Sequence, residues 1–214
     1  MALTTYATLQ TTIADFLNRS DLASVIPTFI DLAEAQINRD VRNWRMENRA
    51  TTTLSSQYLT RPLEWVQTER IRINNGKDSI ELLSSAAMDE MRANVSNITG
   101  TPIGFRHIED QFEFFPTPVG DVQCELVYLQ RVPALTDANT TNWLLDYAPD
   151  IYLYGSLLHT APYLTDDPRI QVWAQLYSAA VLRLNEESAK AEESSTGLRF
   201  RRRGLNTGGS RYNS

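Results

Sequence analysis

The sequence predicts an α+β fold, in which a bundle of about four helices from both chain ends carries an inserted antiparallel β region and an extended C-terminal tail. Three observations support this prediction. Near both ends of the 214-residue chain, apolar residues recur at three- and four-residue steps, as on one face of a helix. In the middle of the chain they alternate with polar residues, as on a strand. Beyond residue 195, glycines and arginines dominate and neither period continues.

These patterns divide the chain into three segments. We expect residues 1–46 and 134–195 to form one helical unit, and residues 47–133 to form a β-rich unit inserted into it. Residues 196–214 are expected to form a flexible basic C-terminal arm, because they offer few large apolar groups to offset the cost of ordering the backbone.

Two helices are predicted before residue 46. The first covers residues 4–18 and begins at Thr4 or Thr5, whose hydroxyl can cap it, and the second runs from about Val25 to Trp44. Their apolar faces consist of Tyr6, Leu9, Ile13, Phe16 and Leu17 in the first helix, and of Ile30, Ala33, Ile37, Val41 and Trp44 in the second. Charges of both signs alternate on the polar face of the second helix, as on a surface that faces solvent or another subunit.

The β region begins after Met46 with the β-branched run Thr51–Leu54. The sequence Asn74-Asn75-Gly76 predicts a hairpin turn, because adjacent positions with positive φ favour Asn and Gly. A short helix is expected at about residues 84–93. Three more strands follow, at residues 104–108, 111–115 and 122–132.

Residues 142–187 are expected to form the centre of the helical unit, as two helices joined by an acidic turn. The predicted apolar faces are Ile151, Tyr154, Leu158 and Ala161 in the first helix, and Ile170, Trp173, Tyr177, Ala180 and Leu184 in the second. Asp167 before Pro168 predicts the start of the second helix. Tyr152 and Tyr154 lie two positions apart and cannot both face one core, so one of them is expected to face a neighbouring subunit or the β-rich unit.

The charge is distributed unevenly along the chain. The whole chain carries −6, and the five arginines from Gly197 onward, without any acid, contribute +5, so the preceding residues carry −11. An acidic body is not the footprint of a DNA-binding domain. No apolar run approaches the ~20 residues that span a bilayer, so no membrane partner is expected. No secretion signal is visible, and the single cysteine, Cys124, suits a reducing compartment.

Few residues are candidates for chemistry. His107, His159 and Cys124 do not have the spacing of metal ligands. Three pairs of carboxylates could in principle serve a glycosidase, namely Glu109/Asp110, Asp146/Asp150 and Asp166/Asp167. Each pair has a local structural explanation as a turn, a helix start or a cap. We therefore expect no catalytic residue, no metal and no cofactor.

The basic arm is the main candidate for binding a partner. Its charged and large apolar residues are Leu198, Arg199, Phe200, Arg201, Arg202, Arg203, Leu205, Arg211 and Tyr212. Three interpretations remain open: a docking arm for a protein partner, a nucleic-acid-binding patch, and an end without function. The first fits a segment that becomes ordered only on a partner with pockets and acids.

Four stretches of the chain carry a resemblance to a known family. They are Thr5–Leu22, Ile30–Arg42, Val127–Leu135 and Asn142–Leu164, the last continued by the motif D-D-P-R at residues 166–169. In order and spacing, these stretches resemble the head-to-tail connector adaptors of short-tailed, podovirus-type bacteriophages. None of them is a catalytic motif.

The resemblance implies a structural virion protein of the viral tail or neck, assembled in the host cytoplasm and without enzymatic activity. It implies a homo-oligomeric ring of about a dozen copies, a dodecamer, between the portal protein and the tail nozzle protein. Such a ring continues the channel through which double-stranded DNA passes, without specific binding, during viral genome ejection. The C-terminal extension would bind the portal. Two alternatives are a peptidoglycan-degrading tail accessory enzyme and a nucleic-acid-binding module that uses the basic arm.

Overall fold

The structure, a computed structural model, describes residues 3–94, 98–164 and 167–196. Its α-helices are α1 (Tyr6–Leu17), α2 (Ile26–Asp40), α3 (Ser85–Asn94), α4 (Trp143–Tyr147), α5 (Pro149–Leu158) and α6 (Arg169–Thr196). Its strands are β1 (Glu47–Leu54), β2 (Tyr58–Thr60), β3 (Trp65–Ile73), β4 (Asp78–Leu82), β5 (Gly104–Ile108), β6 (Gln111–Phe115) and β7 (Val122–Gln130). Short 3₁₀ turns cover Ser20–Leu22, Trp44–Met46 and Ala161–Tyr163.

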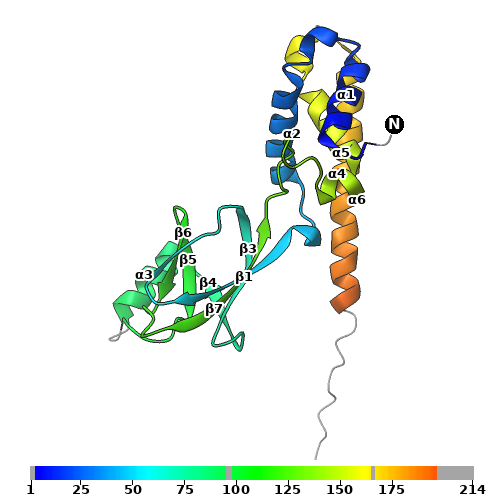
Figure 1. Cartoon of the computed structure of the whole chain (residues 1–214). Coiled ribbons are helices and arrows are strands. Elements are labelled where there is room, and N and C mark those ends of the chain that lie inside the picture. The colour runs from blue at the N-terminus through cyan, green and yellow to red at the C-terminus, as the bar shows by residue number, and fades with distance from the viewer. Residues whose placement is uncertain (1–2, 95–97, 165–166, 197–214) are drawn as a thin grey trace, which may run out of the picture.

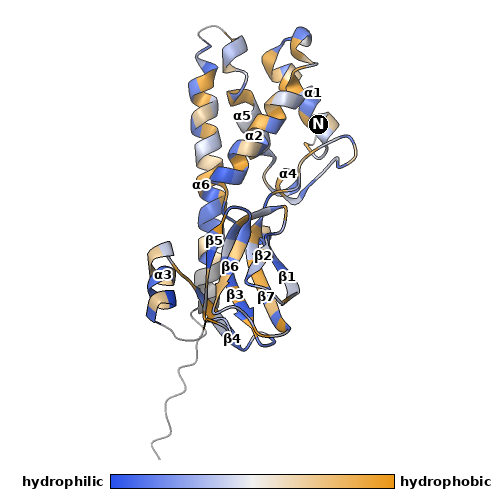
Figure 2. Cartoon of the chain, turned by 90° about the vertical axis from the view of Figure 1, so that its left-hand side faces the viewer, coloured by the Kyte–Doolittle hydropathy of each residue, from blue (hydrophilic) through white to orange (hydrophobic). Residues whose placement is uncertain are grey.

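These elements form two parts with separate hydrophobic cores (Figure 1). The helical part consists of α1, α2, α4, α5 and α6, and the β part consists of the seven strands and α3. Figure 2 shows that apolar residues concentrate where α1, α2, α5 and α6 meet and inside the sheet. The prediction that residues 47–133 form a separately folded unit is not tested by this arrangement and stays a prediction.

The ends of the N-terminal helices follow from local chemistry. Thr5 caps α1 in a capping box, because its hydroxyl accepts a hydrogen bond from the Thr8 N–H while Thr8 Oγ1 accepts one from the Thr5 N–H. Asn18 ends α1 in the left-handed conformation, at φ 52°. Helix α2 ends at Asp40, earlier than predicted. Trp44 is therefore not on its buried face, and this side chain is 48% exposed.

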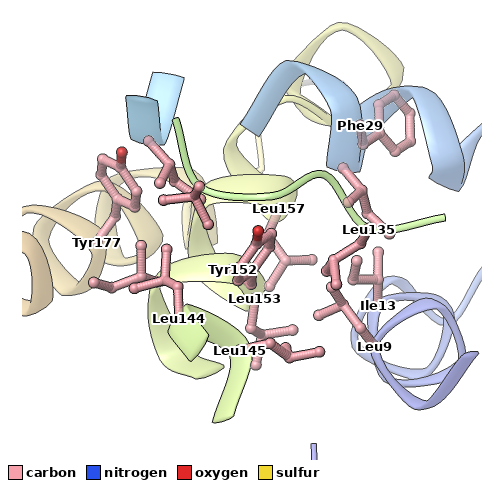
Figure 3. Close-up of a cluster of buried hydrophobic side chains, with 14 of the residues drawn as sticks. Leu9, Ile13, Phe29, Leu135, Leu144, Leu145, Tyr152, Leu153, Leu157 and Tyr177 are labelled. Atoms are coloured by element: carbon pink, nitrogen blue, oxygen red, sulfur yellow. The ribbon is translucent and has the colours of Figure 1, made fainter. Parts of the chain in front are cut away.

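Helix α5 is the centre of the helical part, in contact with α1, α2, α4 and α6. Its side chains are buried around almost the whole circumference, with Tyr152, Leu153 and Leu157 packed between the other helices (Figure 3). The predicted apolar face is incomplete: Ile151 is buried and Tyr154 and Leu158 pack against the core, but the helix also buries side chains outside that face. A helix that is apolar on all sides belongs inside a core.

The second helix of the central pair forms as predicted on its inner face. Trp173, Tyr177 and Leu184 are buried, and Asp167 accepts a hydrogen bond from the Arg169 N–H at 2.9 Å at the start of α6. Helix α6 then continues to Thr196, well past the other helices of the helical part (Figure 1).

The seven strands form one sheet in the order β1-β7-β3-β4-β5-β6-β2, which curls into a nearly closed barrel. Its interior is lined by Leu54, Ile71, Ile73, Ile80, Phe105, Phe112, Phe114, Cys124, Leu126 and Tyr128. The hairpin between β3 and β4 has the predicted turn, since Asn74, Asn75 and Gly76 all have positive φ. Strand β2, which pairs with β6, was not predicted.

The predicted fold class is wrong in its proportions and in its topology. The described chain has six α-helices rather than a bundle of about four, and a seven-stranded barrel-like sheet rather than an inserted antiparallel region. The sheet is also not purely antiparallel, because β4 and β5 pair in parallel, with Glu81 opposite Gly104. The reason is α3, which lies between β4 and β5 in the sequence. A parallel pair needs such a crossover, whereas a hairpin turn makes an antiparallel one.

Candidate functional site

The predicted portal-binding residues lie outside the described residues. They are Leu198, Arg199, Phe200, Arg201, Arg202, Arg203, Leu205, Arg211 and Tyr212, all of them beyond the end of α6 at Thr196. The structure does describe the helix that precedes them. Residues 189–191 of α6 are exposed, whereas Ser188 is buried and contacts Trp44 in the connection to the barrel.

The residues considered for metal binding are not brought together. Cys124 lies inside the barrel, where burial raises the pKa of its thiol to about 11. His107 lies on β5 with its ring centroid 5.2 Å from that of Trp65, whereas His159 ends α5 in the helical part. Burial lowers the pKa of both histidines. Within residues 3–94, 98–164 and 167–196, no group of three or more His, Cys, Asp or Glu side chains could hold a metal ion.

The carboxylate pairs have the local roles that the sequence indicates. Glu109 occupies a positive-φ position in the turn between β5 and β6. Asp146 accepts a hydrogen bond from Thr141 at 2.9 Å, and Asp150 accepts one from the Ile151 N–H at 3.1 Å. Asp167 caps α6, and Asp166 lies outside the described residues.

The two connections between the parts are fixed by side chains of α2 and α6. On the way into the barrel, Asn185 Oδ1 accepts from the Arg42 N–H at 2.9 Å, and Ser188 Oγ accepts from the Trp44 N–H at 2.9 Å. On the way back, Asn38 Oδ1 accepts from the Val132 N–H at 2.9 Å. Because otherwise unpaired backbone groups are satisfied in this way, the joint is held at defined positions on both helices.

A buried polar network lies beside this joint. Glu34 Oε1 accepts hydrogen bonds from the Leu135 N–H at 2.8 Å and from the Tyr152 hydroxyl at 3.2 Å. Asn142 donates to the Tyr152 oxygen at 2.7 Å and to the Pro133 carbonyl at 2.6 Å. Burial raises the pKa of Glu34 to about 7. The network ties the returning chain to α2 and α5.

A second buried carboxylate holds the outer wall of the barrel together. Glu113 on β6 is 1% exposed and accepts hydrogen bonds from Arg92 on α3 and Arg106 on β5. Burial raises the pKa of Glu113, but the two arginines outweigh this effect and hold it below its usual value. The ion pairs fasten α3 to the outside of β5 and β6.

Two surface hollows each have several arginines in their lining, and sequence reasoning did not find either of them. One lies where α2 meets the barrel and is lined by Arg39, Arg42, Arg131, Trp65 and Val66, together with Ala35 and Asn38. The other runs along the outer face of β1, β7 and β3, and Arg45, Arg49, Arg70 and Arg72 contribute to it. The available signal was the alternation of arginine with isoleucine in β3, which places Arg70 and Arg72 on one face.

None of the helices in the described part of the chain is long and apolar enough to cross a membrane.

Comparison with known families adds one finding. The model of a family described as SU10 adaptor protein matches residues 4–203. The match covers both parts of the structure and the first residues of the basic arm. A search of curated proteins found no match.

Proposed function

The chain belongs to the SU10 adaptor protein family, which indicates a structural component of the bacteriophage virion, and we propose that it is the head-to-tail adaptor that joins the portal to the tail nozzle. In this proposal, copies of the chain form a closed ring of about a dozen, following the symmetry of the portal. The ring lies in the neck of the virion and continues the DNA channel during genome ejection. We propose specifically that this virion is of the podovirus type.

The observation that carries the proposal is the family match over residues 4–203, because it spans the whole described structure. The structure adds a feature suited to an adaptor. Helix α6 extends past the helical part and ends at Thr196, where the basic arm begins (Figure 1). An arm attached to a projecting helix can reach a neighbouring ring. At about 3.4 Å per residue, residues 197–214 could span roughly 60 Å when extended.

Charge supports a passive role toward DNA. The body carries −11 when the arm is excluded, so a channel lined by it would repel the phosphate backbone rather than bind it. The arm carries the opposite sign and suits an acidic surface on the portal. A single arm would bind weakly because of its ordering cost, and a ring that presents many arms would bind by avidity.

The adaptor family indicates a structural rather than an enzymatic role. Asp146 and Asp150, one of the three carboxylate pairs considered in the sequence, have the structural partners described above. We expect no turnover of peptidoglycan by the purified protein. Activity that disappeared in Asp146→Asn or Asp150→Asn variants would contradict this expectation.

The proposal is tested by measuring the mass of the purified protein, alone and with its portal protein, by native mass spectrometry. We expect a single closed oligomer on the portal, with a copy number that matches the portal's symmetry. A protein that stays monomeric in both conditions would refute the proposed ring.

A further inference from the structure

The outer face of β1, β7 and β3 forms a groove of about 680 Å³ with an excess of positive charge. The strand register sets Arg49 and Arg70 on either side of Val127, and Arg72 opposite Glu125. Arg45, from the turn before β1, lies over the rings of Trp44 and Tyr147, at 4.7 and 4.0 Å from their centroids. Four arginines thus line the groove with only two glutamates, Glu47 and Glu125.

Both glutamates of the groove form ion pairs with arginines of the groove, but among the described residues two of its four arginines have no such partner. Glu125 pairs with Arg49, and Glu47 lies 3.6 Å from Arg70. Within the described part of the chain, Arg45 and Arg72 have no carboxylate within ion-pair distance. Trp44, which is 48% exposed, also lines the groove and adds apolar surface to it. Arginine beside exposed tryptophan and tyrosine is typical of the centres of protein interfaces.

Helix α3 and its flanking residues form a surface whose charge is complementary to that of the groove. Glu81, Asp89 and Glu90 are exposed, and of these Asp89 alone lies near a described cation, 3.8 Å from Arg92. Arg92 itself is bound to Glu113. The flanking residues Leu82, Ile98 and Ile103 are all more than half exposed. The result is an acidic surface with adjoining apolar side chains, of the kind that marks an interaction site.

Helix α3 and the groove lie on opposite sides of the barrel, and Glu81, on β4, lies between them. Helix α3 is fastened to the outside of β5 and β6, whereas the groove lies outside β7 and its neighbours, and the interior residues of the barrel separate them. Figure 1 shows α3 at the end of the β part that is farthest from α6. Complementary patches on opposite faces of one chain are what a head-to-tail ring requires, since each copy then uses both patches.

We propose that the β parts form the contacts between neighbouring copies in the ring, with the acidic α3 surface of one copy seated on the arginine groove of the next. This inference rests on the ring of the proposed function and identifies the surfaces that close it. The occupant is a second copy, because the matching acidic and apolar surface lies on the same chain.

The contact is tested by reversing the charge of each surface separately and then combining the two reversed surfaces. The groove variant is Arg70→Glu/Arg72→Glu, and the α3 variant is Asp89→Lys/Glu90→Lys. The matched control, Arg19→Glu/Arg183→Glu, reverses two exposed arginines of the helical part. Each protein is checked for folding by circular dichroism, and its oligomer is measured by native mass spectrometry, alone and with the portal.

We expect the groove variant and the α3 variant each to need at least a tenfold higher concentration than the unmodified protein to form the ring. The control should assemble normally. An equal mixture of the two variants should assemble again, because each groove then meets an α3 surface of opposite charge, and so should the fourfold variant. Added salt should weaken the unmodified contact, as exposed ion pairs are screened.

Other outcomes would overturn the inference. If the unmodified protein forms the ring and the groove variant does so equally well, the ring stands and its contact lies elsewhere. A mixture that fails to assemble would refute the pairing of these two surfaces. If the groove variant keeps the ring but loses binding to a short DNA duplex, the groove serves nucleic acid. If the unmodified protein forms no oligomer even with the portal, the proposed function fails as well.

If a charge-reversal variant does not fold, a disulfide crosslink between neighbouring copies tests the same contact. Copies with Arg72→Cys are mixed with copies with Glu90→Cys and oxidised. The native Cys124 is buried and does not compete. Disulfide-linked dimers that form only in the mixture support the contact, and their absence from assembled rings refutes it.

Discussion

The hydroxyl of Tyr152 donates a hydrogen bond of 3.2 Å to Glu34 Oε1 inside the helical core, where neither residue is more than 8% exposed. The same carboxylate oxygen accepts the Leu135 N–H, so one buried group joins α2, α5 and the chain returning from the barrel. The cost of burying Glu34 appears in its pKa, which burial raises to about 7. This arrangement makes the stability of the helical part sensitive to pH.

We expect the unfolding free energy to fall as the pH rises from about 4.5 to about 7, by about 1–3 kcal/mol from this group alone. The folded state keeps the proton of Glu34 to a higher pH than the unfolded state does, so its contribution is complete at low pH and is lost as Glu34 ionises. Urea unfolding of the Glu34→Gln variant across this range should lack that fall. A variant with the same pH dependence as the unmodified protein would show that Glu34 titrates normally.

Replacing Trp173 with Ala should lower the unfolding free energy by about 3–5 kcal/mol, because this 5%-exposed side chain fills the core between α6 and its neighbours. The adjacent Val172 is 53% exposed, and Val172→Ala should change stability by no more than about 0.5 kcal/mol. Denaturant midpoints of the two variants compare the two faces of α6 directly. Similar midpoints would place Trp173 outside the core.

Replacing Glu113 with Ala should destabilise the β part by about 2–4 kcal/mol. Removing one partner of a buried pair leaves the other charge uncompensated, and the cost is reduced here because Arg92 remains 31% accessible. Since the pKa of Glu113 is held low in the folded state, its contribution is present above the unfolded pKa and is lost as the pH falls. Glu109→Ala, in an exposed turn, is the control, and hydrogen exchange of β5 and β6 is the readout.

Truncation after Ser195 should leave a folded, soluble body that no longer assembles on the portal, because the arm is proposed to be the anchor. Reversing Arg201, Arg202 and Arg203 should weaken assembly, and more strongly at low salt, where exposed ion pairs count most. Sedimentation of mixtures with the portal measures both effects. A truncated protein that still forms a complete ring would place the anchor in the body.

A fragment of residues 47–133 should fold by itself if the proposed division of the chain is correct. Every buried residue of the barrel core lies between Leu54 and Tyr128, within this fragment. A cooperative thermal transition by circular dichroism would support the division. A fragment without a transition would show that the barrel depends on the helical part.

The local elements were largely determined by the sequence. The capping residues Thr5 and Asp167, and the turn at Asn74–Gly76, act within a few residues and were predicted correctly. The bounds of the strands at residues 104–108 and 111–115 were predicted correctly as well, and on the last strand Cys124, Leu126 and Tyr128 share the inner face of the barrel as predicted. The inner face of α6 follows from its three- and four-residue spacing.

The tertiary structure alone decided how these elements combine. Periodicity could not show that α5 is surrounded, since a helix buried on all sides has no single apolar face. Periodicity also could not show that β4 pairs in parallel with β5, because this pairing depends on strand order. For the same reason it could not show that the arginine groove and helix α3 lie on different sides of the barrel. Glu34 lies 118 residues from Tyr152 in the chain, and only packing joins it to Tyr152 and Asn142 in one network. Local chemistry fixes where an element starts and which way its side chains alternate, whereas contacts distant in sequence decide what each face meets.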